Sequence, residues 1–124
     1  SGFHVNMEDS QAAMRDGSIF EYCKLHDVVI QAWSVLQFGY FKGNFVGNEK
    51  FQALNQVLDR LAIKYGVTSS TIAVSWILRY PAKMQAVVGT TNPKHLREVS
   101  QAANFSLTRK EWYEIYLAAG NNLP

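Results

Sequence analysis

A glycine and two hydroxyl residues, Gly89-Thr90-Thr91, come directly after the mostly apolar run of residues 84–88. Asn92-Pro93 follows and is typical of a helix start, with asparagine at the N-cap and proline in the first helical position. Backbone N–H groups at such a start attract anions, and His95, one turn later, would add a donor. Two interpretations stay open. The run is either an anion site or a strand-to-helix turn with good capping residues, and the local sequence alone favours the turn.

Two further segments place polar or aromatic residues at the end of an apolar run. Trp33 ends the run of residues 28–33 and precedes Ser34. Its indole could stack on a flat heterocycle, although a tryptophan at a strand end is more often a core or rim residue. Near the N-terminus, Asn6 alternates with His4 and Glu8, so the three share one face of a strand. That face is either a ligand-facing surface or, more commonly, a solvated one.

The remaining candidates have structural explanations. His26-Asp27 has the residue types of a catalytic pair, but His26 comes at a helix end, where a cation is favourable. Cys23 lies on the apolar face of the same helix and is expected to be an inert core residue. The three histidines share no metal-ligand spacing, and the sequence has no phosphate-loop, GxGxxG or Gly-x-Ser-x-Gly motif. No metal site is therefore predicted.

The elements that would position these residues alternate between strands and helices. The periodicity predicts strands over 3–7, 28–33 and 84–88, a long loop over 37–48, and helices over 19–26, 51–65, 68–80, from 92 and from 108. This order favours parallel β/α units, in which ligands bind at the carboxyl ends of the strands. The three polar segments would then meet at one edge of the sheet.

Local signals mark the helix ends and the buried faces. Gly66 is expected to be a C-cap glycine, Thr68 an N-cap residue, and Thr108 with Glu111 a capping box. The helix from residue 92 should point Leu96, Val99 and Ala103 inward. The helix from residue 108 should carry Trp112, Ile115 and Ala119 on one face. The strand over 28–33 should be covered by helices on one side and by packed core on the other.

Size and composition suit one domain. The chain has 124 residues, of which 48% are hydrophobic and 18% charged, with a net charge of +2. So small a charge, with scattered Lys and Arg, predicts neither a nucleic-acid nor a membrane partner. The lone Cys23 excludes an internal disulfide, and the sequence has no run of 18 apolar residues. Its first eight residues are not expected to act as a signal peptide, because they lack a basic and an apolar region. The expected location is cytoplasmic.

Read together, the segments resemble the aldo-keto reductase family over essentially the whole chain. Residues 19–36 are similar to its segment of Tyr-Cys, a strand, and Ala-(Tyr/Trp)-Ser-x-Leu. Residues 71–78 are similar to its Ala-x-x-Ala-Leu-x-Trp helix, residues 87–98 to its Ile-x-Gly-x-Ser cofactor segment, and residues 105–108 to the Leu-Thr entry to its last helix. The resemblance implies an α/β fold that is the C-terminal part, about three β/α units and a terminal helix, of a (β/α)8 TIM barrel. Residues 1–124 would then be a single, incomplete domain.

The resemblance also implies a cofactor, NADPH, with NADH as the alternative. Trp33 would stack on the nicotinamide and Asn6 would bind its carboxamide. Ser34, Val35 and Leu36 would line the pyrophosphate and ribose. The adenosine end would lie against Gly89, Thr90, Thr91, His95 and Glu98. Three departures bear on this assignment: Asn6 is shorter than the family's Gln, His95 replaces an Arg that pairs with the 2′-phosphate, and Val99 replaces an Asn.

By the same resemblance, the function is NAD(P)H-dependent reduction of aldehydes or ketones to alcohols, with a small carbonyl substrate in the intact enzyme. The Asp, Tyr, Lys and His tetrad of relatives lies upstream of residue 1, so no catalytic residue is assigned, and this chain alone is expected to be inactive. An incomplete barrel exposes strand edges and apolar faces, which predicts self-association. Two alternatives stay open: a non-catalytic cofactor-sensing or regulatory module, and a structural dimeric fragment without a ligand.

Overall fold

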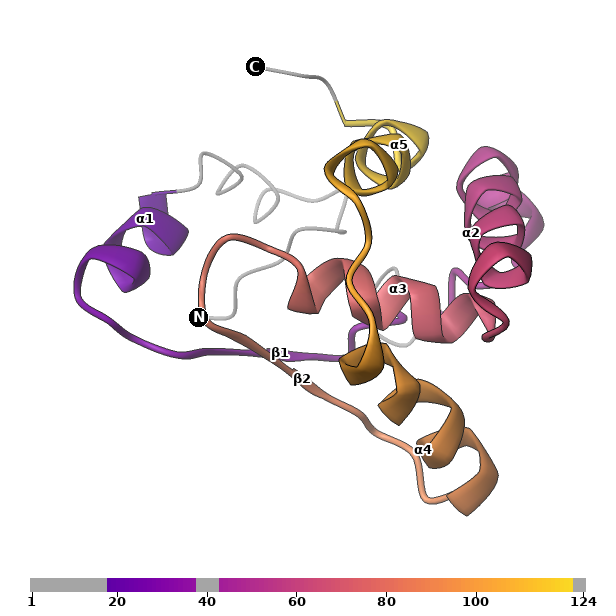
Figure 1. Ribbon diagram of the computed structural model, residues 1–124, viewed down its shortest axis with the longest axis horizontal. Coiled ribbons are helices and arrows are strands. Elements are labelled where there is room, and N and C mark those ends of the chain that lie inside the picture. The colour runs from indigo at the N-terminus through magenta and orange to yellow at the C-terminus, as the bar shows by residue number, and fades with distance from the viewer. Residues whose placement is uncertain (1–17, 38–42, 122–124) are drawn as a thin grey trace.

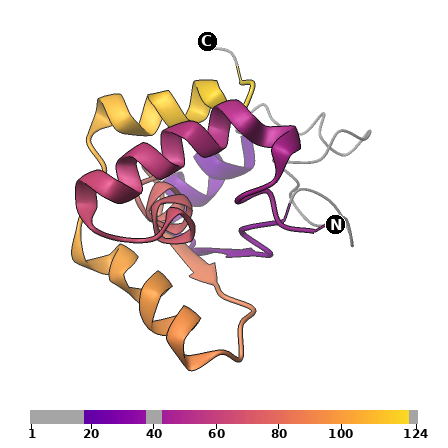
Figure 2. The same ribbon diagram turned by 90° about the vertical axis from the view of Figure 1, so that its right-hand side faces the viewer.

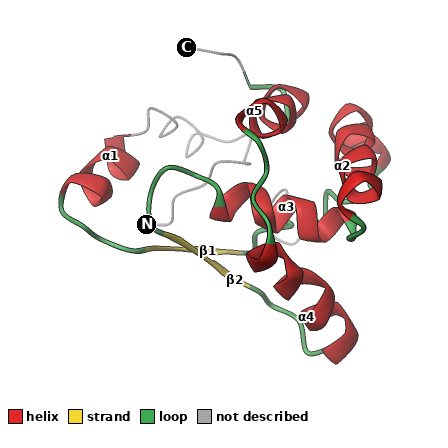
Figure 3. Cartoon of the chain, viewed as in Figure 1, coloured by secondary structure: helices red, strands yellow, loops and turns green. Residues whose placement is uncertain are grey.

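The computed structural model describes residues 18–37 and 43–121. Figure 1 labels the α-helices and strands, and Figure 3 colours the chain by secondary structure. In chain order they are α1 (Ser18–Leu25), β1 (Ile30–Trp33), η2 (Glu49–Phe51), α2 (Gln52–Tyr65), α3 (Ser69–Leu78), β2 (Met84–Val87), α4 (Pro93–Ser100), η3 (Gln101–Asn104) and α5 (Arg109–Ala118). Every helix and strand predicted within these residues is present and in the predicted order. The strand expected over residues 3–7 lies outside them.

β1 and β2 form a two-stranded parallel sheet. Ile30 lies opposite Met84 and Trp33 opposite Val87. Parallel neighbours need a long crossover, which α2 and α3 supply here. α3 then packs back on one face of the sheet (Figure 1). The parallel β/α arrangement predicted from the alternating elements is confirmed.

β1 is shorter than the predicted strand, and the described residues cover one of its faces. Val28 and Val29 lie outside it and are 43% and 47% exposed. Exposure alternates along both strands, so Trp33 and Val87 share the open face. The prediction that packed core covers this second face is therefore wrong for the described residues. Within these residues, helices cover only the other face.

The main core lies where α2, α3 and the segment entering α5 meet. Its most buried side chains, each at most 1% exposed, are Leu58, Leu61, Ile72 and Leu107. Figure 2 shows α2 and α5 running side by side. These contacts join residues distant in sequence, so packing of apolar helix faces stabilises the fold.

The chain turns sharply between α2 and α3 at Gly66. This residue has a left-handed φ of 66°, and its N–H donates to Ile63 while that of Val67 donates to Ala62. The predicted C-cap glycine and the Thr68 N-cap are both confirmed.

In the described part of the chain no single helix is long and apolar enough to cross a membrane. Residues 49–65 and α3 have that length and composition only as a pair, bent by 93°.

The prediction that three apolar residues of the helix from residue 92 point inward is only partly correct. Asn92 caps α4 as expected, and Val99 is 2% exposed. However, Leu96 is 50% exposed, and Ala103 is exposed in η3 because α4 ends at Ser100. Both border an open groove rather than the core.

A buried carboxylate at the start of α5 connects this helix to α2. Thr108 and Glu111 form the predicted capping box, and Glu111 is 4% exposed. Its carboxylate accepts hydrogen bonds from Lys64 Nζ (2.7 Å), the Thr108 N–H (2.8 Å) and the Tyr65 hydroxyl. Burial raises the pKa of Glu111, but the hydrogen bonds from Lys64, Tyr65 and Thr108 outweigh it and lower the pKa to about 2.

The apolar face predicted for this last helix is also partly correct. Ile115 is buried and Trp112 is half-buried. Ala119 is exposed because it lies beyond the last residue of α5, at the C-cap.

Candidate functional site

Trp33 and the Gly89-Thr90-Thr91 turn lie at the same end of the sheet. Trp33 is the last residue of β1 and pairs with Val87, two residues before Gly89. Because the strands are parallel, both carboxyl ends reach the same edge, where open α/β sheets bind ligands. Trp33 is 53% exposed and lies on the open face of the sheet. The structure thus brings together two of the three polar segments. Asn6, in the third, lies outside the described residues.

The turn after β1 has an unusual backbone. Ser34 has a φ of 54°, in the left-handed region that non-glycine residues seldom occupy. Gln37 closes the turn by donating its N–H to the Ser34 carbonyl at 2.9 Å. Val35 packs against the buried cluster of Val74 and Val99, and Leu36 packs against the main core. A ligand at this edge would therefore meet Val35 and Leu36 mainly through their backbone.

The turn after β2 is organised by its own side chains. The Thr90 hydroxyl accepts from the Asn92 N–H at 3.2 Å. Asn92 Oδ1 in turn accepts from the N–H groups of Lys94 (3.0 Å) and His95 (3.4 Å), and Leu96 donates its N–H to the Asn92 carbonyl. Since Pro93 has no N–H, the start of α4 offers fewer free donors than its sequence suggests.

Other groups are left for a ligand beside this turn. Thr91 is exposed and Thr90 is half-buried. Within the described residues, the backbone N–H groups of Gly89, Thr90 and Thr91 donate no hydrogen bond. An anion at this edge would find more unused N–H donors in these residues than at the helix start.

His95 and Glu98 follow on α4, three residues apart, and neither side chain is fully buried. Residues at this spacing are neighbours on a helix surface. The Glu98 carbonyl accepts a hydrogen bond from the buried Thr71 hydroxyl at 2.8 Å, which holds α4 against α3. The position of His95 and Glu98 relative to the turn is thereby tied to the core.

The structural explanation of His26 and Asp27 agrees with the structure. The His26 ring lies 4.3 Å from that of Tyr22, centroid to centroid. Asp27 forms an ion pair with Lys83, the residue before β2. These residues lie at the start of the strands, opposite the end that carries Trp33.

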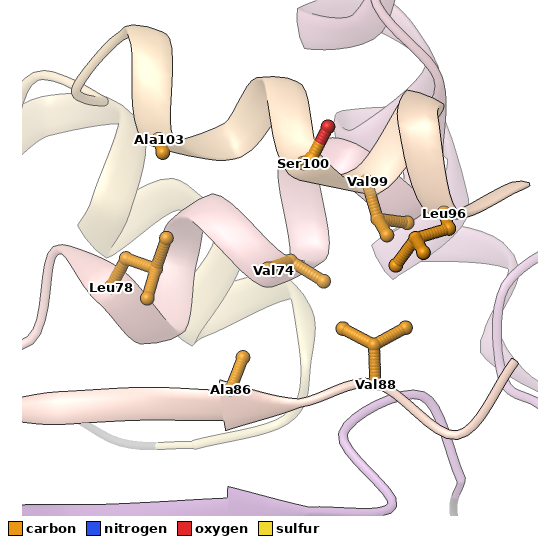
Figure 4. Close-up of a pocket in the computed structure, with 8 residues that line it drawn as sticks. All are labelled: Val74, Leu78, Ala86, Val88, Leu96, Val99, Ser100 and Ala103. Carbon is orange, nitrogen blue, oxygen red and sulfur yellow. The ribbon is translucent and has the colours of Figure 1, made fainter.

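The groove beside α4 is a separate feature. It has a volume of about 260 Å³ and lies between α3, β2 and α4 (Figure 4). Its lining is apolar except for one hydroxyl and consists of Val74, Leu78, Ala86, Val88, Leu96, Val99, Ser100 and Ala103. Such a surface offers almost no hydrogen-bond donors to phosphates and riboses, so it does not suit a dinucleotide.

One buried polar residue near the loop after β1 was not singled out from the sequence. Asn55 lies on the apolar face of α2, between Leu54 and Leu58, and is 8% exposed. The sequence did carry a signal, because an asparagine on an apolar helix face is expected to be buried, and a buried amide requires hydrogen-bond partners. The identity of those partners requires the structure, since they belong to the loop before α2.

A sequence profile described as the Aldo/keto reductase family matches residues 7–118, almost the whole chain. The chain belongs to the aldo/keto reductase family. The resemblance drawn from its motifs is confirmed.

Two curated proteins with similar sequences are named as reductases. A 6-dehydroglucose reductase of Agrobacterium fabrum is 34% identical over 89 residues, which cover 71% of this chain and 28% of that protein. A 6-dehydroglucose reductase of Novosphingobium aromaticivorans is 30% identical over 94 residues, covering 75% of this chain and 30% of that protein. The chain thus spans less than a third of the length of either relative.

Solved aldo-keto reductases share its fold. A thermostable member, crystallised with the inhibitor epalrestat, matches with a TM-score of 0.63 and 26% identity, covering 91% of this chain and 36% of that one. A member from a Medee basin deep-sea metagenome library has a TM-score of 0.57 at 16% identity, covering 86% and 36%. The predicted fold class, an α/β portion of a (β/α)8 barrel, is confirmed.

Proposed function

We propose that this chain is the cofactor-holding part of an NAD(P)H-dependent oxidoreductase that reduces aldehydes or ketones to alcohols. The observation that carries the proposal is the exposed Trp33 ring at the same sheet edge as the Gly89-Thr90-Thr91 turn. Two relatives at 30% identity or more are named 6-dehydroglucose reductase, and that name supports a carbonyl substrate.

The residues at this edge fit a nicotinamide dinucleotide chemically. An accessible indole suits the flat nicotinamide ring, and hydroxyl and backbone N–H groups suit phosphate and ribose oxygens. When bound, the cofactor supplies a hydride. In this proposal Trp33 orients the ring, and the Ser34–Leu36 backbone with Asn6 binds around it. Thr90, Thr91, His95 and Glu98 hold the adenosine end, with NADPH as the cofactor and NADH as the alternative.

Catalysis requires residues beyond this chain in this proposal, because the chain spans only 28% and 30% of the length of two reductases that it matches.

The open face with Trp33 and Val87, together with the exposed Leu25 and Val29, also leads us to propose self-association through a second copy. The lone Cys23 and the family support a cytoplasmic location.

Titration of the purified full chain with NADPH by calorimetry tests the proposal. Trp33→Ala should raise the dissociation constant by about 10-fold, since a large aromatic contact to the ligand is lost. Trp33→Phe, which keeps an aromatic ring, should lose less. Tyr22→Ala is the matched control, because Tyr22 is a 61% exposed aromatic residue on α1, away from this edge. Equal affinities for Trp33→Ala and Tyr22→Ala would contradict the assignment.

A further inference from the structure

Asn55 is a polar residue enclosed by apolar ones in the middle of α2. It is 8% exposed, and the neighbouring Leu54 and Leu58 are 7% and 0% exposed. A buried amide is costly unless its donors and acceptor are used. Here all of them are used, and every partner is a backbone group of residues 45–51.

The side-chain amide of Asn55 holds the loop that enters α2 through both its oxygen and its nitrogen. Oδ1 accepts from the Gly47 N–H at 2.8 Å. Nδ2 lies within hydrogen-bond distance of the carbonyls of Phe45 (2.9 Å), Phe51 (3.0 Å) and Asn48 (3.2 Å). One side chain therefore replaces the regular backbone pairing that this irregular segment lacks.

The loop is in turn joined to the end of β1. Phe45 donates its N–H to the Leu36 carbonyl at 3.0 Å, and Asn44 forms an antiparallel bridge with Gln37. Phe45 is also part of the main core, at 8% exposure. A continuous path of contacts thus runs from Asn55 through Phe45 to Leu36, three residues after Trp33.

The backbone conformation of Ser34 needs support from the neighbouring loop. Its left-handed backbone, with a φ of 54°, is unfavourable for a residue with a Cβ. Conformations of this kind persist only when the surrounding structure determines them strongly. The turn is closed locally by the bond from Gln37 to Ser34, and Gln37 itself is paired with Asn44 of the loop that Asn55 holds.

We infer that Asn55 is a positioning residue for the dinucleotide site: it fixes the loop over residues 44–48 and so keeps the Ser34 turn in its ligand-ready form. The inference rests on the proposed function. Without Asn55, the Ser34 turn relaxes toward ordinary backbone conformations, and a ligand must select the remaining ordered fraction. If that fraction falls to about one tenth, the apparent dissociation constant rises about 10-fold.

Two alanine variants of α2 separate positioning from plain stability. Asn55→Ala and Leu58→Ala both empty a buried position of the same helix, but Leu58 has no hydrogen bond to the loop. Both are made in the full chain and compared at a temperature where circular dichroism shows each to be folded. We expect NADPH affinity, measured by calorimetry, to fall about 10-fold for Asn55→Ala and less than about 2-fold for Leu58→Ala.

A readout without cofactor accompanies the titration. In ¹⁵N-labelled protein, the Ser34 amide and the Trp33 indole resonances should shift in Asn55→Ala and stay in place in Leu58→Ala. Ser34→Gly should restore part of the affinity in the Asn55→Ala background, because glycine adopts a positive φ without external support. A merely structural role for Asn55 predicts no such rescue.

The outcomes are distinguishable. If the unaltered chain binds neither NADPH nor NADH, the proposed function is overturned, and the positioning role falls with it. If the unaltered chain binds NADPH and the two alanine variants lose affinity equally, only the role of Asn55 is overturned. Unshifted Ser34 and Trp33 resonances in Asn55→Ala would overturn it as well.

Discussion

The indoles of Trp76 and Trp112 exchange hydrogen bonds: each ring nitrogen donates to the backbone carbonyl of the other residue at 3.0 Å. The rings lie 4.6 Å apart, centroid to centroid, and within 7° of parallel. Each indole N–H is thereby satisfied by an element distant in sequence, one in α3 and the other in α5. This pairing fixes how the last helix packs on the rest of the fold.

Removing one of these bonds should destabilise the protein measurably. Trp112→Phe keeps an aromatic ring against Trp76 but loses the indole donor, so the Trp76 carbonyl loses its partner. We expect the free energy of unfolding to fall by about 1–3 kcal/mol in urea titrations. Tyr113→Phe is the control on the neighbouring position. An equal loss in both variants would show that the hydrogen bond is unimportant.

The Glu111 carboxylate should make stability depend on pH at the acid end. Its folded pKa of about 2 lies below its usual value of 4.5. Its contribution is therefore full above pH 4.5 and is lost as the pH falls toward 2. The shift corresponds to about 3 kcal/mol at neutral pH. Glu111→Gln should flatten the acid limb of the stability profile measured by urea titration. Glu114→Gln, which removes only the surface ion pair with Arg60, should leave this limb nearly unchanged.

Tyr65 should add a second limb at alkaline pH. Its hydrogen bond to Glu111, its burial and the Glu111 charge raise the pKa of Tyr65 from 10.0 to about 12. A raised pKa means that the protonated hydroxyl is favoured in the folded state. Stability should thus hold below pH 10 and decline as the pH rises through 12. In Tyr65→Phe this decline should become smaller and keep only the part that Tyr80 contributes, because burial raises the pKa of Tyr80 as well. An unchanged decline would contradict the role of Tyr65.

His95 should limit discrimination between the two nicotinamide dinucleotides. An imidazole ring lacks the planar fork of donors with which arginine makes a bidentate contact to a 2′-phosphate. We expect His95→Arg to raise the preference for NADPH over NADH by about 10-fold, an energy in the range of one charged hydrogen bond. The measurement is the ratio of the two dissociation constants. His26→Arg, at the opposite end of the strands, should not change this ratio.

The open sheet face should drive association of the chain. Trp33 is 53% and Val87 45% exposed on this face, and Leu25 is 80% exposed before β1. Analytical ultracentrifugation of the full chain should show a concentration-dependent dimer or larger species. Val87→Lys should weaken it, because a charge on the face must be desolvated on contact. Ile63→Lys, at an 84% exposed position of α2, is the control. A monomer at all concentrations would contradict self-association.

Short-range signals accounted for most of the secondary structure. Gly66, Thr68, Asn92 and Thr108 each act on groups within five residues, and all four cap a helix as the sequence predicts. The parallel sheet followed from the alternation of elements, and with it the shared edge of Trp33 and the glycine turn. Rules of this kind depend on chain topology, which the order of elements largely determines.

Features that depend on distant partners could not be predicted. Leu96 was expected to be buried, but its exposure depends on what covers the groove between α3 and α4. The left-handed Ser34 has no local marker such as glycine, and the partners of Asn55 become evident only once the loop is folded. In each case the sequence carries the residue type but not the neighbour that decides its role.

The face that presents Trp33 and Val87 serves both proposals, so a dinucleotide and a second copy of the chain would compete for it. Competition of this kind is a thermodynamic linkage: each occupant lowers the apparent affinity of the other by the same factor. Adding NADPH should then shift the sedimenting population toward smaller species, and raising the protein concentration should weaken apparent cofactor binding. The sheet face that the described residues leave open would thus couple the assembly of this protein to the concentration of its nucleotide.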